Sequence, residues 1–256
     1  MISLNIAQAS DLSERLAELF ESELPYIDRM LRLRKLTEQL YKYLTSDSRL
    51  SFNGLFARMQ YANNEANISS QLATRANQLR ILCNQIVHDE ISTVDKSTFE
   101  TSARVVASLI SIFCEGYSNP FLSQLLTSDS IKDYQPKKHS EKHSFICVLD
   151  AWSIKPNSAG QEALEIIATK DDGYSCTVIL NNSDTEHGID GRKYTILAKS
   201  LWKYASIHFH HLTPVSGREG VYQSNPKTLV VLEPDFLVDT SAIAECFDES
   251  YSNPAY

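Results

Sequence analysis

The hydrophobic period of this chain changes once, and that change limits the folds open to it. Up to about Ser128, apolar residues recur every three or four positions, as at Leu12, Leu16 and Leu19. After about His143 they alternate in short runs rich in β-branched and aromatic residues, such as "SFICVLDAW". One segment cannot satisfy both periods, so the sequence predicts a helical region followed by a β region, an α+β chain.

The first half is expected to be an all-α helical bundle of four to six helices. A cap at Ser10 or Asp11 should begin the first helix, and Pro25 should open the second. Later helices are expected at 52–63, 68–88 and 98–115.

The second half is expected to hold five strands and one helix. The helix is expected at 194–204, between the third and fourth strands. The strands are expected at 144–152, 163–170, 175–182, 206–212 and 228–233. This is the element order of an OB-fold, so we expect a five-stranded, OB-like β-barrel.

A polar run with Pro136, "DSIKDYQPKKHSEKH", separates the two halves and indicates a linker. The predicted organisation is a bundle at 1–128, a linker at 129–142, an OB-like domain at 143–247 and an acidic tail at 248–256. A length of 256 residues suits two domains of about 100 to 150 residues each.

Composition narrows the class of protein further. No apolar run approaches the roughly 18 residues that a membrane helix needs, and the start lacks a signal-peptide pattern. We therefore expect a soluble, cytoplasmic protein without a membrane partner. Its cysteines are far apart and form no C-x-x-C pair, which predicts buried thiols rather than disulfides or a zinc ribbon. They are Cys83, Cys114, Cys147, Cys176 and Cys246.

The charge distribution argues against a protein whose main task is gripping duplex DNA, which would usually carry a net basic domain. The net charge is −8, and residues 129–232 hold 12 basic against 12 acidic side chains. From Glu233 to Glu249 there are six acidic residues and no basic one. Any contact with nucleic acid must use a local groove.

One polar stripe in the bundle is a candidate site for RNA. Arg80, Asn84 and His88 are four apart, so on a helix they share a face away from the apolar stripe. A histidine and an arginine could activate a 2'-hydroxyl and hold a phosphate.

The segment from Asn84 to His88 resembles the motif of the HEPN superfamily, whose ribonucleases place an arginine immediately before the polar residue. Here that position is Cys83, and a thiol cannot replace a guanidinium. The chain is more similar to the noncatalytic branches, and the resemblance implies a bundle that forms a homodimer through this stripe. RNA binding without cleavage, or a HEPN ribonuclease using Arg80 and His88, are the alternatives.

The predicted barrel carries a second candidate site, for single-stranded nucleic acid. OB-folds stack bases on aromatic rings over a basic groove. The aromatic candidates are Trp152 and Tyr174, and the basic ones are Arg192, Lys193, Lys199, Lys203 and Arg218. Trp202 and Phe209 are more typical of core residues.

No metal or cofactor is expected. In "HFHH", His208 and His210 share a strand face, but a zinc site normally needs three or four ligands. Asp235, Asp239 and Glu245 lack the downstream lysine that a metal-dependent nuclease would require. The sequence also has no P-loop.

The second half, from "EALEIIATKDDGYSCTVIL" to "SNPKTLVVLEPDFLVDTSAIAECF", resembles the region ahead of the nuclease and helicase parts of large bacterial helicase-nucleases of superfamily one. That resemblance implies that the 256 residues are either an N-terminal fragment of a longer natural chain or a stand-alone remnant, and that a helicase or nuclease is a partner. The sequence thus predicts a non-catalytic nucleic-acid-binding and dimerisation module. A HEPN-type ribonuclease and a protein-docking adaptor are the alternatives.

Overall fold

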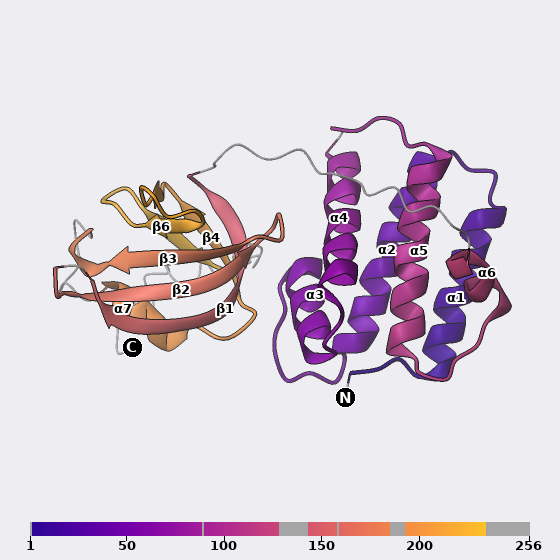
Figure 1. Cartoon of the computed structure of the whole chain (residues 1–256), viewed down its shortest axis with the longest axis horizontal. Coiled ribbons are helices and arrows are strands. Elements are labelled where there is room, and N and C mark those ends of the chain that lie inside the picture. The colour runs from indigo at the N-terminus through magenta and orange to yellow at the C-terminus, as the bar shows by residue number, and fades with distance from the viewer. Residues whose placement is uncertain (1, 89, 128–142, 158, 185–192, 234–256) are drawn as a thin grey trace, which may run out of the picture.

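The computed structural model describes residues 2–88, 90–127, 143–157, 159–184 and 193–233, and it confirms an α+β chain in which helices precede a sheet (Figure 1). The expected linker at 129–142, the expected tail at 248–256 and residues 234–247 of the expected second domain lie outside the described residues. Among the described helices, none combines the length and apolar character that crossing a membrane requires.

Six helices form the described part of the first half. They are α1 (Ile6–Glu21), α2 (Tyr26–Thr45), α3 (Gly54–Glu65), α4 (Ser70–Val87), α5 (Lys96–Phe113) and α6 (Pro120–Thr127). The expected cap at Ser10 or Asp11 was wrong because α1 begins a turn earlier. Asn5 accepts a hydrogen bond from the Gln8 backbone, and the Gln8 side chain accepts one from Asn5 in return.

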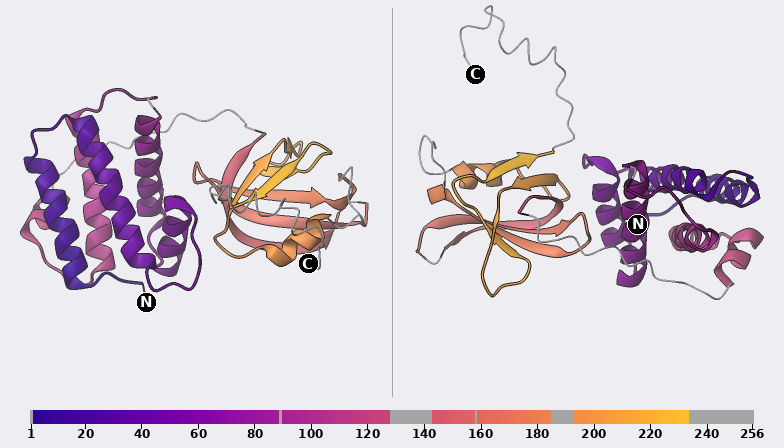
Figure 2. Two further views of the ribbon diagram at one scale, coloured as in Figure 1. Left: turned by 180° about the vertical axis from the view of Figure 1, so that it is seen from behind. Right: turned by 90° about the horizontal axis from the view of Figure 1, so that it is seen from above.

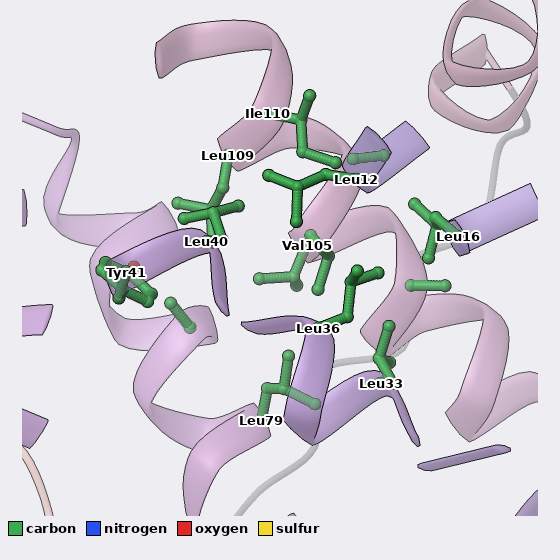
Figure 3. Close-up of a cluster of buried hydrophobic side chains, with 14 of the residues drawn as sticks. Leu12, Leu16, Leu33, Leu36, Leu40, Tyr41, Leu79, Val105, Leu109 and Ile110 are labelled. Atoms are coloured by element: carbon green, nitrogen blue, oxygen red, sulfur yellow. The ribbon is translucent and has the colours of Figure 1, made fainter. Parts of the chain in front are cut away.

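Apolar side chains of these helices meet in one core (Figure 3). Leu12, Leu36 and Leu40 are fully buried or nearly so. Tyr41 is buried with them, and its hydroxyl donates a 3.0 Å hydrogen bond to Asn63 Oδ1. This bond satisfies a polar group that would otherwise be costly inside the bundle.

Seven strands, rather than the expected five, form the sheet in the described part of the second half. They are β1 (Phe145–Pro156), β2 (Glu162–Lys170), β3 (Ser175–Asn181), β4 (Ser206–His210), β5 (Thr213–Pro214), β6 (Val221–Gln223) and β7 (Leu229–Leu232). The two unexpected strands, β5 and β6, have two and three residues, so neither shows a period of two.

The strand order is β5-β6-β3-β2-β1-β4-β7. β1 pairs with both β2 and β4, and β6 runs parallel to β3, while the other pairs are antiparallel. The sheet curls around a second core that includes Ile166, Val178 and Phe209 (Figure 2).

The helix expected at 194–204 is shorter than predicted. α7 (Lys193–Leu197) passes into a 3₁₀ turn, η2 (Ala198–Ser200), and the chain then turns toward β4. Tyr204 adopts a left-handed backbone with φ of 70°, which a continuing helix cannot accommodate.

The expectation of buried thiols is confirmed for four cysteines. Cys83, Cys114, Cys147 and Cys176 are free and buried, and Cys246 lies outside the described residues.

Candidate functional site

A third cluster of buried side chains lies between the bundle and the sheet. Its members are Phe56, Ala57, Val148 and Tyr204, with Phe52 and Tyr61 packed against it. α3 and α4 are the helices on the side of the bundle nearest the sheet (Figure 1). A hydrogen bond of 3.2 Å from Ser206 Oγ to the Asn53 carbonyl adds a polar contact. We call this boundary the seam.

Arg80 lies in the seam and is only 8% exposed. Its Nε donates to Asn77 Oδ1 at 2.9 Å, and its Nη2 donates to the carbonyl of Asp171 in the β2–β3 turn. Its guanidinium carbon lies 4.5 Å from the centroid of the Phe56 ring. Burial lowers the pKa of Arg80 to about 10, against an opposing effect of Asp171. The guanidinium is thus committed to joining the two halves.

The three residues of the predicted stripe do not share one environment. Asn84 is half-buried, whereas His88 is exposed where α4 ends. Cys83 faces the bundle core, where its thiol donates to the Met30 carbonyl at 3.7 Å. Burial raises the pKa of the Cys83 thiol to about 12, so it stays protonated at neutral pH. The position before Asn84 therefore presents no cation to a phosphate.

The β2–β3 turn approaches α4 very closely. Gly173 has φ of 91°, and a Cβ there would lie 2.8 Å from Asn77 Nδ2. Asn77 Nδ2 also donates to the Asp171 carbonyl at 3.4 Å. Tyr174 follows directly and is 65% exposed. Glycine is needed here because of both its backbone conformation and the close approach.

Charged groups and aromatic rings follow one another along the seam. The Arg58 guanidinium lies 5.6 Å from the Phe52 ring, and the Phe52 and Tyr61 ring centroids are 4.9 Å apart. Tyr61 meets Tyr204 edge-on at 5.3 Å, and Lys203 Nζ lies 4.8 Å from the Tyr204 ring. We call these five residues the seam strip.

Sequence reasoning missed four members of the seam strip. Of the five, only Lys203 was a predicted site residue. The available signal was the spacing of Phe52, Phe56 and Tyr61 in and just before a short helix. That pattern provides more aromatic side chains than one face of a short helix needs for its own core.

The structure separates the nucleic-acid candidates of the second half. Trp152 packs against the sheet core, and its Nε1 donates to the Ala198 carbonyl at 3.1 Å. Its ring is partly buried by these contacts. Lys199, Lys203 and Arg218 are exposed. Arg192 lies outside the described residues, and only the backbone of Lys193 is described, at the start of α7.

The core assignments of Trp202 and Phe209 are confirmed, since Phe209 is fully buried and Trp202 packs against the same cluster.

Tyr174 directly precedes β3 and Arg218 lies shortly before β6, and because β3 and β6 are parallel both residues lie at the same end of the sheet. Arg218 belongs to the turn between β5 and β6, and the carbonyl of Gly220 in that turn accepts a 2.9 Å hydrogen bond from the Thr177 amide of β3. A Cβ on Gly220 would lie 3.3 Å from the carbonyl of Ser175, the residue after Tyr174. The turn thus rests against the start of β3, beside the exposed tyrosine.

The histidines of β4 stack on each other, with the ring centroids of His208 and His210 3.9 Å apart. Within the described ranges, no three His, Cys, Asp or Glu side chains group as a metal site would require. The carboxylates of Asp235, Asp239 and Glu245 lie outside those ranges.

Neither models of known protein families nor curated protein sequences match this chain. A proposal about function therefore rests on the fold and the contacts given above.

Proposed function

We propose that this chain is a non-catalytic module that binds single-stranded nucleic acid through its sheet domain. The strand pairing supports an OB-like interpretation. β1 pairs with β2 and β4, β6 lies parallel to β3, and α7 comes between β3 and β4. In this interpretation β6 is the fifth barrel strand, and β5 and β7 are additions.

The observation that carries the proposal is the exposed ring of Tyr174 at the same end of the sheet as the exposed Arg218. A base stacked on an aromatic ring contributes about 1 to 3 kcal/mol, and every base has a face to offer. Arg218 adds a cation for the phosphate, and exposed Lys199 and Lys203 add others along the connection to β4. Because the contacts are few, we expect weak binding with strong salt dependence.

The ribonuclease alternative loses its cation, because Arg80 is held by Asn77, Asp171 and Phe56. The sheet also covers the Arg80 end of the stripe. A homodimer of the proposed HEPN type would therefore have to use Asn84, His88 and the surface around them. A helicase or nuclease partner would supply the catalysis.

The test is fluorescence anisotropy of the full chain with labelled single-stranded and duplex oligonucleotides at low and physiological salt. We expect the single strand to bind better, and a Tyr174→Ala, Arg218→Glu double variant to weaken its binding about tenfold or more. Arg15→Glu is the control, because it makes the same charge change on α1, away from the sheet (Figure 1). Absence of binding at low salt, or equal binding by the double variant, would favour a protein-docking adaptor instead.

A further inference from the structure

The two ends of the seam lie beside residues of the proposed binding surface. At one end, the β2–β3 turn touches α4 through Gly173 and Asn77, and the next residue is Tyr174. At the other, Tyr204 touches Tyr61 of α3, and the preceding residue is Lys203. A strand bound along the sheet would therefore meet the bundle.

The residues of the seam strip are of the types that bind single-stranded nucleic acid. Phe52, Arg58 and Tyr61 are partly exposed, and Lys203 is exposed, whereas Tyr204 is only 1% exposed. Arg58 Nη1 donates a 2.6 Å hydrogen bond to Thr45 Oγ1, which leaves its other nitrogen atoms to face a phosphate. Rings with flanking cations match bases with flanking phosphates. Lys203, unlike the rings, is left exposed, and an exposed cation contributes little to holding two domains together.

Acidic groups limit where a strand could run. Lys203 interacts electrostatically with Glu65 at the end of α3 and with Asp150 of β1. Both carboxylates would repel phosphate, so the backbone should pass on the Arg58 side of the rings rather than over Glu65.

From these contacts we infer that the helical bundle supplies part of the binding surface, and that a single strand continues from the sheet across the seam strip. Phe52 and Tyr61 stack bases, and Arg58 and Lys203 contact phosphates. This inference rests on the proposed function and goes beyond it, because it assigns a binding role to the bundle and a longer site to the whole chain.

The first test measures the affinity of the full chain for oligonucleotides of 6 and 15 nucleotides. One series is made of deoxythymidine and the other of uridine. In the unaltered chain, the longer strand should bind at least tenfold more tightly. Phe52→Leu, Tyr61→Leu should lose most of that gain and keep the affinity for the short strand, because leucine retains apolar packing but offers no ring. Phe121→Leu on α6 is the control, a half-buried aromatic on the far side of the bundle (Figure 1). A gain in affinity with length in either series supports the inference. The series that binds more tightly identifies the preferred sugar.

A second measurement covers the case in which the double variant disturbs the seam. Photo-crosslinking of 5-iodouracil oligonucleotides to the unaltered chain should label Phe52 or Tyr61 as well as Tyr174. Labelling of Tyr174 alone, or an unchanged length gain in the double variant, overturns the inference and leaves the proposed function standing. Failure of every oligonucleotide to bind overturns both.

Discussion

Asp150 stands at the irregularity of β1, where the register with β2 shifts between Leu149 and Ala151. Its carboxylate accepts a 2.9 Å hydrogen bond from Thr169 Oγ1. Burial has the larger effect and raises the pKa of Asp150 above its usual value of 3.8, although Thr169 and Lys203 oppose it. Folding therefore disfavours the ionised carboxylate relative to the unfolded chain.

We predict that Asp150→Asn stabilises the chain slightly at pH 7. The folded-state pKa is raised, so the folded chain binds more protons than the unfolded chain between pH 3.8 and that raised pKa. As the pH falls through this window, the unaltered chain should therefore become more stable relative to the variant. Urea unfolding at pH 7 and pH 4 measures the difference, with exposed Asp47→Asn as control. A variant less stable at pH 7 would show that Thr169 and Lys203 outweigh burial.

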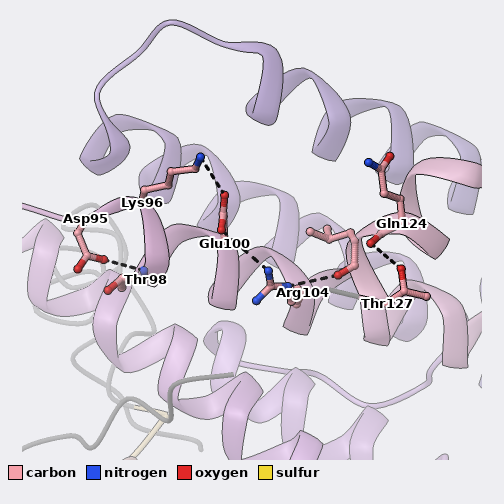
Figure 4. A network of polar contacts seen from close by, with 8 residues as sticks. Asp95, Lys96, Thr98, Glu100, Arg104, Gln124 and Thr127 are labelled. Atoms are coloured by element: carbon pink, nitrogen blue, oxygen red, sulfur yellow. Dashed lines mark hydrogen bonds and ion pairs between the residues drawn. The ribbon is translucent and has the colours of Figure 1, made fainter. Parts of the chain in front are cut away.

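At the scale of elements, α5 illustrates how side chains stabilise the start of a helix and join it to its neighbour. Asp95 Oδ1 accepts a 2.7 Å hydrogen bond from the Thr98 amide, and Lys96 and Arg104 flank Glu100 at 3.7 and 3.9 Å (Figure 4). Arg104 Nε also donates to the Leu125 carbonyl at 3.3 Å, which joins α5 to α6.

We expect Asp95→Ala to lower the free energy of unfolding by about 1 kcal/mol, because the first turn of α5 loses its side-chain acceptor. Asp95→Asn should keep nearly all of that stability, since an amide oxygen caps equally well. Thermal or urea unfolding followed by circular dichroism compares the two. Equal losses in both variants would point to the charge of Asp95, rather than to its hydrogen bond.

The elements also show what periodicity can and cannot predict. Five strands were expected, and β1, β2, β3, β4 and β7 lie at those places because each contains a run of β-branched or aromatic residues that the sequence shows. β5 forms because it pairs with β6, and β6 forms because it also pairs with β3. No local sequence pattern encodes these pairings. Likewise, the helix after β3 ends early because Tyr204 must turn into the seam, a constraint set by distant residues.

For the whole molecule, the sequence could not place the two halves against each other. A period identifies the face that an element turns to its own core, and Arg80 lies outside the core cluster of the bundle. The face of α4 that carries Arg80 is covered by Asp171, which is 91 residues away from Arg80 in the sequence. Tyr174, Lys203 and Arg218, which the structure leaves exposed, were chosen as candidates from residue type, whereas the bundle's share of the seam strip depends on docking that only the structure reveals.

Arg80 provides the test of that docking. We predict that the unaltered chain unfolds in one transition, and that Arg80→Ala separates it into two, with a larger radius of gyration in X-ray scattering. The loss of charged hydrogen bonds to Asn77 and Asp171 should cost about 1.5 to 3 kcal/mol. Arg80→Lys should be intermediate, because it keeps the charge but not the planar fork that reaches both partners.

Lys96→Ala is the matched control, because it removes a cation that lies 3.7 Å from Glu100 in an exposed pair on α5. It should leave both the single transition and the radius of gyration unchanged. If Arg80→Ala behaves in the same way, the apolar contacts of Phe56, Val148 and Tyr204 hold the halves together without the arginine. In that case the burial of its guanidinium would be a consequence of docking rather than a cause.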